Sequence, residues 1–291
     1  MLNKIFQTIK YCSLSFLITL STLYAHEKIC IVIPAYNEEK RISTTLTTYA
    51  DYFKHKPEKT TFLVVANNCS DKTVHVVKQV AKKYSNIDII DLKPGGKGFA
   101  IKEGFLWALN SKKDFDLIGF VDADMATLPQ YFYDLIKACK NHDGAIASRY
   151  MKDSVVEPKR PWSRKVGGKI YNWMLKALFG LKYKDTQCGA KIFNQDTIAK
   201  VTPNMHETGW SFDLELLYLC KLFGKDIEEV ATTWSDQPGS HLKISSKLAK
   251  EFLNSPKRIK QRHKQKRDDF KKAERLAKKK RKDDQKRARK K

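Results

Sequence analysis

Short apolar runs alternate with amphipathic segments along most of this 291-residue chain. Apolar runs bounded by turn residues predict buried strands, and apolar residues spaced three and four apart predict helices. The predicted strands are 28–33, 62–65, 87–90, 117–121 and 145–147, the first of them ending at Pro34. The predicted helices are 38–53, 71–84, 98–109, 128–139, 162–179 and 210–223. This alternation indicates an α/β fold, with a doubly wound, mostly parallel sheet and helices on both of its faces.

The two ends of the chain depart from this pattern. An apolar run at 11–25 is shorter than the roughly 20 residues that a membrane-spanning helix needs. It is compatible with a signal peptide, a short membrane anchor or an interfacial segment, and we favour the anchor. After Ser255 the apolar periodicity ends, which indicates a solvated helix or a disordered tail. The expected organisation is a hydrophobic segment at 1–27, a globular domain at 28–245 and a polybasic tail at 246–291.

The net charge of +24 is concentrated in this tail. Residues 257–291 contain 20 Lys or Arg against 5 Asp or Glu, a charge of +15. Nucleic-acid binding is one interpretation, but the segment has a single aromatic residue, Phe270, and no evident stacking platform. We therefore favour an anionic membrane surface, to which each nearby Lys or Arg contributes about 1 kcal/mol. The six cysteines form no CxxC pair, which fits a reducing compartment.

The most informative motif is Asp122-Ala-Asp124, which follows the buried run at 117–121. The carboxyl end of a parallel strand lies at the edge of the sheet where ligands bind. Two carboxylates at this edge suit a hard divalent cation, Mg²⁺ or Mn²⁺, which would carry the phosphates of a nucleotide. Taken alone, such a pair is more often a solvated acidic turn, and the other motifs decide in favour of the metal site.

A second motif, Pro-Ala-Tyr-Asn-Glu-Glu at 34–39, follows the first strand. Its acidic residues either complement a helix dipole or contribute to a nucleoside contact at the same edge of the sheet. With the Asp-Ala-Asp pair, this opening resembles the family 2 inverting glycosyltransferases, which have a GT-A fold. Further stretches, in order and spacing, resemble the dolichyl-phosphate (polyprenyl-phosphate) beta-glucosyltransferases of that family: Pro94-Gly-Gly-Lys97-Gly98, Ser148-Arg149, Asp185-Thr-Gln187-Cys-Gly189, Trp210-Ser-Phe-Asp213-Leu-Glu215 and Trp234 with Pro238-Gly-Ser240.

Two positions depart from patterns common among these relatives. Asn67 stands where family members commonly have an Asp that contacts the base, and an amide donates as well as accepts, so the identity of the base stays open. Ala126 stands where mannosyl-type enzymes often have Gln, which resembles the glucosyl-type enzymes instead.

The resemblance implies transfer of glucose, with inversion, from UDP-glucose to dolichyl or polyprenyl phosphate. It implies a membrane-associated enzyme whose catalytic domain faces the cytoplasm, where nucleotide sugars occur. Asp122 and Asp124 would hold Mg²⁺ or Mn²⁺, and Lys97, Arg149 and Arg164 could meet phosphates. The implied catalytic residues are Asp122, Asp124, Arg149, Gln187 and Asp213. The implied donor-binding residues are Pro34, Tyr36, Asn37, Glu38, Asn67, Lys97 and Asp122.

Asp213 also stands out without the family. On a helix that begins at Trp210 it shares a face with Leu214 and Leu217, and a carboxylate among apolar residues must be paired or bound. It is either neutralised by Lys or Arg, or it faces the metal, the sugar or the acceptor. A lipid phosphate needs no strong base, because its second pKa is near 6. Transfer to a glycan or protein hydroxyl is the alternative reaction, and Asp213 would then be the candidate base.

Overall fold

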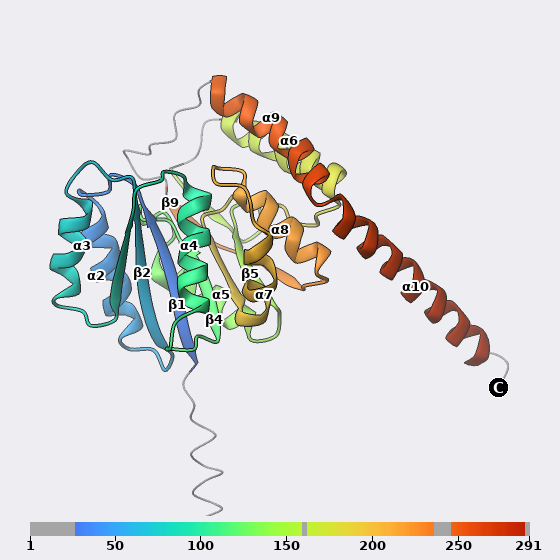
Figure 1. Cartoon of the computed structure of the whole chain (residues 1–291), viewed down its shortest axis with the longest axis horizontal. Helices are drawn as coiled ribbons and strands as arrows, with labels where there is room; N and C mark the ends of the chain where they lie inside the picture. The colour runs from blue at the N-terminus through green and yellow to red at the C-terminus, as the bar shows by residue number, and fades with distance from the viewer. Residues whose placement is uncertain (1–26, 159–161, 236–245, 289–291) are drawn as a thin grey trace, which may run out of the picture.

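The computed structural model describes residues 27–158, 162–235 and 246–288 (Figure 1). The hydrophobic segment expected at 1–27 lies outside the described residues except for Glu27, as does Pro238-Gly-Ser240. The side chain of Arg164 also lies outside them. Among the helices that the structure describes, none combines the length and the apolar character needed to cross a membrane.

Seven strands form the central sheet, in the order β3-β2-β1-β4-β7-β5-β8. β7 runs antiparallel to its neighbours β4 and β5, and the other neighbouring pairs are parallel. The mostly parallel α/β architecture predicted from the sequence is therefore confirmed. A separate parallel pair is formed by β6 and β9. The strands are β1 (Lys28–Ala35), β2 (Lys59–Asn67), β3 (Ile87–Leu92), β4 (Leu117–Val121), β5 (Gly144–Ser148), β6 (Val155–Glu157), β7 (Ala190–Asn194), β8 (Ile227–Ala231) and β9 (Thr233–Ser235).

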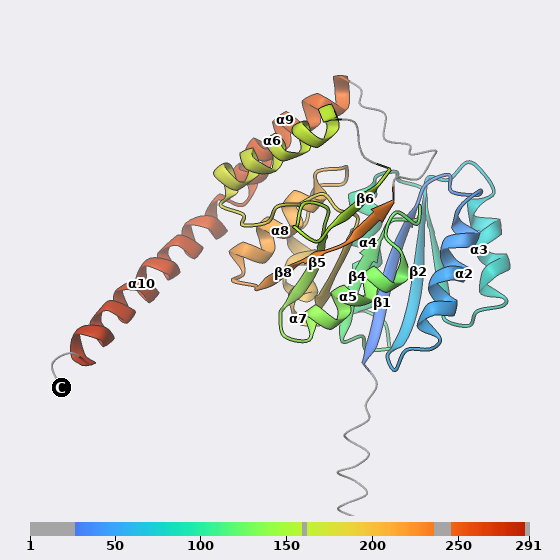
Figure 2. The ribbon, with the colours of Figure 1, turned by 180° about the vertical axis from the view of Figure 1, so that it is seen from behind.

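Helices cover both faces of the sheet (Figures 1 and 2). Side chains of α2, α3 and α5 pack on one face, and those of α4, α7 and α8 pack on the other. Strand β1 shows why both faces are covered, because Cys30 and Val32 point into one core and Ile31 and Ile33 into the other. The helices are α2 (Ile42–Phe53), α3 (Thr73–Ala81), α4 (Lys97–Leu109), α5 (Pro129–Cys139), α6 (Trp162–Phe179), α7 (Gln195–Val201), α8 (Phe212–Leu222), α9 (Ser246–Arg262) and α10 (Lys264–Ala288).

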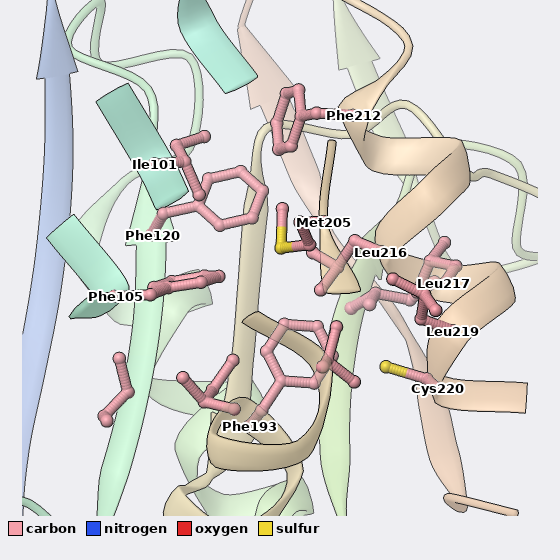
Figure 3. Close-up of a cluster of buried hydrophobic side chains, with 14 of the residues drawn as sticks. Ile101, Phe105, Phe120, Phe193, Met205, Phe212, Leu216, Leu217, Leu219 and Cys220 are labelled. Atoms are coloured by element: carbon pink, nitrogen blue, oxygen red, sulfur yellow. The ribbon is translucent and has the colours of Figure 1, made fainter. Parts of the chain in front are cut away.

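The core under α4 and α8 is rich in aromatic side chains (Figure 3). Phe120 of β4 lies edge-on to Phe212 of α8, with 5.5 Å between the ring centroids. Gly104 brings α4 close to the sheet, since a Cβ there would collide with the methyl groups of Val32. This packing fixes the first turn of α8, which carries Phe212, against the strand that ends in the Asp-Ala-Asp motif.

Two sequence predictions need correction. Strand β1 continues through Pro34 to Ala35 and stays paired with β2. Its pairing with β4 ends at Val32, so the proline stands where β1 has one neighbour and a missing N–H is tolerated.

The prediction of a solvated segment after Ser255 is also wrong for the first turns. Ser255 and Ile259 are fully buried and His263 is 3% exposed. These residues are four apart and share one helix face, which the sequence pattern concealed because serine and histidine are not apolar. α10 projects away from the globular body (Figure 1).

Candidate active site

Asp122 and Asp124 lie at the carboxyl edge of the sheet, directly after β4. The Asp122 N–H donates to the Gly189 carbonyl at 2.9 Å, and an Asp124 carboxylate oxygen accepts the Ala126 N–H at 3.0 Å. Between them and the next helix, Met125 adopts a left-handed backbone with φ of 61°. Such a backbone is uncommon outside glycine, and its cost indicates that the surrounding structure determines the shape of this loop.

Side chains of α2 form hydrogen bonds with the same loop. The Thr45 hydroxyl donates to the Ala123 carbonyl, and the Tyr49 hydroxyl donates to the Thr127 carbonyl, both at 2.7 Å. All four residues are buried. The loop that carries the two carboxylates is therefore fixed by hydrogen bonds to a helix that packs on the sheet, which favours a preorganised site.

Lys97, in the first turn of α4, neutralises one of the carboxylates. Its Nζ lies 2.6 Å from Asp122 Oδ1 and sits over the rings of Trp210 and Phe212. Burial alone would lower the pKa of Lys97, but the Asp122 carboxylate, followed by that of Asp213, raises it above the ordinary value. Lys97 is thus a permanent cation beside the carboxylate pair.

The negative charge of Asp124 is less well neutralised than that of Asp122. The pKa of Asp124 is raised, first by burial and then by the negative charge of Asp122. The negative charge of Asp122 beside Asp124 also attracts a divalent cation. The pair therefore fits Mg²⁺ or Mn²⁺, which is often bound by one or two carboxylates together with substrate phosphates. The described residues contain no group of three or more His, Cys, Asp or Glu arranged to hold a metal.

Gly189 lies against the Asp122 side chain. A Cβ at this position would overlap the Asp122 carboxylate itself. Gly189 precedes β7, which pairs with β4 so that Ala190 lies opposite Val121. The absence of a side chain at 189 therefore leaves the space that the carboxylate occupies.

The glycine segment before α4 is shaped by the loop that follows a short 3₁₀ helix, η1 (Thr202–Asn204). Gly96 has φ of 129°, and a Cβ there would collide with the Thr208 carbonyl. The same carbonyl accepts the Phe99 N–H at 3.1 Å. Asn67 at the end of β2 donates from Nδ2 to the Gly96 carbonyl at 2.9 Å and is only 3% exposed. These contacts fix the N-terminus of α4, and with it Lys97.

The 34–39 segment lies at the same edge and contacts the loop after β2. Asn37, with φ of 53°, accepts the Ser70 N–H at 2.8 Å, and the Glu38 N–H donates to the Thr73 hydroxyl at 2.7 Å. The Glu38 carboxylate also binds Arg41 through both oxygens. Tyr36, by contrast, is 46% exposed. The structure thus gathers the sequence-predicted nucleoside residues, with Glu38 and Asn37 already bonded to the protein.

Arg149 at the end of β5 binds Asp185. Its Nε and Nη2 lie 2.7 and 2.9 Å from the two Asp185 oxygens, and Asp185 is fully buried. Burial raises the pKa of Asp185, but the Arg149 guanidinium and several N–H donors outweigh it and hold that pKa below the ordinary value. Two of the donors expected to meet a phosphate are therefore occupied, and the assignment of Arg149 to a phosphate stays a prediction.

Gln187 follows this ion pair in the chain. Its N–H donates to Asp185 Oδ1 at 3.1 Å, which fixes its backbone. Its side-chain Nε2 is buried and has no hydrogen-bond partner in the described parts of the chain. A buried amide without a partner costs roughly 1–3 kcal/mol, so this donor is a candidate for a ligand oxygen.

Asp213 is paired with a lysine, one of the two explanations that the sequence left open. Lys191 of β7 is fully buried and places Nζ 2.5 Å from Asp213 Oδ1 and 2.7 Å from the Cys188 carbonyl. Burial raises the pKa of Asp213, and Lys191 and then Lys97 oppose that rise. Carboxylates and ammonium groups thus alternate beneath the site, from Asp122 through Lys97 and Asp213 to Lys191.

Sequence reasoning missed Lys191 and an ionic network around Glu207 and Glu215. Glu215 is fully buried, accepts the backbone N–H groups of residues 206 and 207, and lies 2.8 Å from the His263 ring. Arg258 and Arg262 of α9 both bind the Glu207 carboxylate. The position of Lys191 within the apolar stretch at 188–193 was a usable signal for its pairing, because a buried lysine requires an acid. The network had no local signal, since its acids and bases are about 50 residues apart.

Both the sequence and the fold of this chain are similar to those of known proteins. The family model for glycosyl transferase family 2 matches residues 30–201. The chain belongs to this family, in agreement with the resemblance drawn from its motifs. The fold is GT-A: glucosyl-3-phosphoglycerate synthase of Mycobacterium tuberculosis, crystallised with Mn²⁺, UDP and phosphoglyceric acid, superimposes with a TM-score of 0.57 at 15% identity, covering 80% of this chain and 79% of that one.

Within this family, the chain is similar to dolichyl-phosphate beta-glucosyltransferases. Dolichyl-phosphate beta-glucosyltransferase of Trichomonas vaginalis is 34% identical over 233 residues, which is 76% of this chain and 69% of that protein. The enzyme of the same name from Saccharomyces cerevisiae is 31% identical over 248 residues, 77% of this chain and 72% of its own. That from Homo sapiens is 28% identical over 231 residues, 74% and 70% of the two chains.

The role of Gly189 can be tested by Gly189→Ala. The added methyl group must displace the Asp122 carboxylate, so we expect transferase activity to fall by at least about 100-fold, as misplacement by 1 Å can cost. The melting temperature should change little, because the Asp122 side chain can rotate away. Gly209→Ala is the matched control, since a Cβ there meets nothing within 4 Å. Wild-type activity in Gly189→Ala would contradict this role.

Asp185→Asn tests the buried ion pair with Arg149. Loss of the charge leaves Arg149 buried without a counter-ion, and we expect a loss of about 3–5 kcal/mol in the free energy of unfolding at pH 7. Because the folded pKa of Asp185 is depressed, this stabilisation is complete above its unfolded pKa and is lost as the pH falls through the folded pKa. Urea unfolding should therefore give a constant gap between wild type and variant from about pH 5 to 8, narrowing below about pH 4. The exposed Asp196→Asn serves as the control, and a gap independent of pH down to pH 2 would refute the assignment.

Proposed function

We propose that this chain transfers glucose from UDP-glucose to dolichyl or polyprenyl phosphate with inversion at the sugar. The relatives that align over about three quarters of the chain are dolichyl-phosphate beta-glucosyltransferases, which supports this proposal. The structural observation that carries the choice of acceptor is the Asp213–Lys191 pair. The carboxylate best placed to act as a base is bound to a buried ammonium group, so an acceptor that is already an anion suits this site.

On the donor side, Asp122 and Asp124 would hold Mg²⁺ or Mn²⁺ against the diphosphate of UDP-glucose. The metal supplies positive charge that stabilises the leaving diphosphate. Lys97 adds a fixed cation at the same place, because its ammonium is held beside Asp122. The nucleoside would lie along the segment that carries Pro34, Tyr36, Asn37 and Glu38 and the end of β2 at Asn67.

On the acceptor side, an oxygen of the lipid phosphate attacks C1 of glucose from the face opposite to UDP. The new C1–O bond forms as the bond to UDP breaks, and the electron pair of that bond leaves with UDP. No proton has to be removed, because a phosphate monoester with a second pKa near 6 is mostly a dianion at neutral pH. The Nε2 of Gln187, which has no partner among the described residues, and the remaining N–H donors of Arg149 are the groups we assign to orienting the phosphate.

Transfer to the hydroxyl of a glycan or protein is the second candidate reaction. It would use the same donor site but requires a base, and Asp213 is the carboxylate that the sequence offers. Burial raises the pKa of Asp213, which would suit a base, but its Oδ1 already lies 2.5 Å from the Lys191 Nζ, and this contact opposes the role. The lipid phosphate is therefore the better supported acceptor.

A lipid acceptor and a cytosolic donor together favour a membrane-associated enzyme whose catalytic domain faces the cytoplasm. The charge of +15 on residues 257–291 supports contact with an anionic membrane surface rather than with nucleic acid. The hydrophobic segment at 1–27 remains our candidate for an anchor.

Metal dependence through the carboxylate pair is the first test of the donor site. Asp122→Asn and Asp124→Asn should each reduce glucose transfer by at least about 1,000-fold, because each removes a metal ligand and a charge facing the diphosphate. Transfer would be measured with Mg²⁺, with Mn²⁺ and with excess chelator, and circular dichroism would verify folding. Asp134→Asn, on the exposed face of α5, is the control. Undiminished transfer in chelator would reject the metal assignment.

The acceptor is tested by transfer to polyprenyl phosphate and to a free glycan over a range of pH. With the lipid phosphate, the rate should fall below about pH 6 as the acceptor takes up a proton. Asp213→Asn should destabilise the protein by about 3–5 kcal/mol because Lys191 loses its partner, and the double variant Asp213→Asn/Lys191→Met should recover most of that loss. The recovered double variant should still glucosylate polyprenyl phosphate with the same acidic limb. A loss of about 10²–10⁴-fold despite recovered stability would identify Asp213 as a base, and glucose on the glycan but never on the lipid would overturn the proposal.

A further inference from the structure

Helices α6 and α9 lie side by side and expose large apolar side chains (Figures 1 and 2). On α6, Ile170 is 60% exposed, Trp173 70% and Leu178 41%; on α9, Leu253 is 70% exposed. Isolated apolar residues are common on protein surfaces, but four large ones on two adjoining helices form a patch. The four make up half of the eight large apolar residues that are exposed in the described structure, and none of the four belongs to the site after β4.

The two helices also enclose a groove with a cationic rim. A cavity of about 430 Å³ lies between Met174 and Leu178 of α6 and Leu253 and Pro256 of α9. Its remaining wall is formed by residues on one face of α9 and by the start of α10: Lys257, Lys260, Gln261, Lys264 and Arg267. None of these lining residues is acidic. An apolar floor with a positive rim matches a surface that is apolar inside and negative outside.

The other face of α9 is fixed to the globular domain. Ile259 is fully buried, His263 lies against Glu215, and Arg258 is paired with Glu207. α9 therefore cannot rotate to bury Leu253 without breaking this network. The apolar residues on its outer face are held outward by the ionic residues on its inner face.

The patch lies at the same end of the molecule as the candidate active site. Figures 1 and 2 show α6 and α9 beyond the carboxyl ends of the parallel strands. The inner face of α6 contacts the site directly, because Asn172 accepts a hydrogen bond from the Thr186 hydroxyl at 2.9 Å, next to Gln187. A surface bound to α6 and α9 would therefore be close to the residues assigned to the acceptor phosphate.

We propose that this patch, which consists of Ile170, Trp173, Leu178 and Leu253 with Lys257, Lys260 and Lys264, docks on the surface of an anionic phospholipid bilayer. This inference rests on the proposed function, because docking here would bring the lipid-phosphate acceptor to the site. It differs from the tail hypothesis in placing the contact on α6, α9 and the first residue of α10 rather than along the length of α10. The apolar residues enter the interface and the lysines meet the phosphate groups.

Quenching of tryptophan fluorescence tests the contact at one residue of the full chain. Wild-type protein would be mixed with vesicles of phosphatidylcholine and about one-third phosphatidylserine, with brominated acyl chains as the quencher. Trp173 is one of five tryptophans, so quenching should occur in wild type and largely disappear in Trp173→Phe. This readout is local and is therefore independent of any other segment that holds the chain on the vesicle. Equal quenching in Trp173→Phe would overturn the proposal.

Partition to the same vesicles, measured by sedimentation, tests the patch against the tail. Trp173→Ser/Leu253→Ser should weaken binding at least about tenfold, and Lys257→Gln/Lys264→Gln about fivefold for each charge removed. The matched controls on α10, Leu276→Ser and Lys271→Gln/Lys272→Gln, should have smaller effects. Effects of the controls equal to those of the patch variants would assign binding to the tail, and a lipid-free dimer abolished by Trp173→Ser would assign the patch to a second copy of the chain. Equal binding to vesicles without phosphatidylserine would also overturn the anionic specificity.

Failure of this inference can be separated from failure of the proposed function. The patch variants should turn over a soluble short-chain polyprenyl phosphate at the wild-type rate, because they leave the site unchanged. Wild-type protein that glucosylates no polyprenyl phosphate but still shows Trp173 quenching would refute the acceptor and leave the docking surface intact. Loss of short-chain turnover in the patch variants would show that the patch is part of the site and would refute docking as its role.

Discussion

The crowding of negative charge at the end of β4 is the constraint on which the rest of the site depends. Asp122 and Asp124 stand two residues apart in a partly buried loop, and the pKa of Asp124 is raised by burial and by its neighbour. Lys97 lies against Asp122, and the positive charges of Lys97 and Arg41 do not offset the rise in the pKa of Asp124. This imbalance supports the proposed binding of a divalent cation with a diphosphate at this edge, and the glycines at 96 and 189 allow the close approach of the surrounding segments.

A second buried charge pair limits which chemistry the site can perform. Asp213 and Lys191 lie beneath Lys97, and their mutual neutralisation lets β7 carry a lysine inside the core. The same contact occupies one oxygen of the carboxylate that the sequence offers as a general base. This pairing supports the proposal of an acceptor that arrives as an anion.

The C-terminal basic segment has two structurally different parts, which its charge alone does not distinguish. Its first turns join the globular domain, because Arg258, Arg262 and His263 meet Glu207 and Glu215. The Glu207 loop in turn contacts the glycine segment that positions Lys97, since a Cβ at Gly98 would meet the Glu207 carbonyl. Helix α9 is therefore part of the framework behind the donor site, while its outer face and α10 remain available to a partner.

The sequence by itself determined the α/β class, the strand that ends in the Asp-Ala-Asp pair and the family, because apolar periodicity and short motifs are local properties. It located helix 162–179 and strand 117–121 to the residue, and it left Asp213 as either a paired or a reacting group. Tertiary structure decided that question, because Lys191 lies 22 positions away and meets Asp213 only when β7 inserts beside β4. Tertiary structure also decided that the first turns of the tail pack on the globular domain, because the acids that pair with them are about 50 residues distant in the chain. Pairings between charges that are distant in the chain depend on how the elements pack, so a local sequence pattern does not predict them.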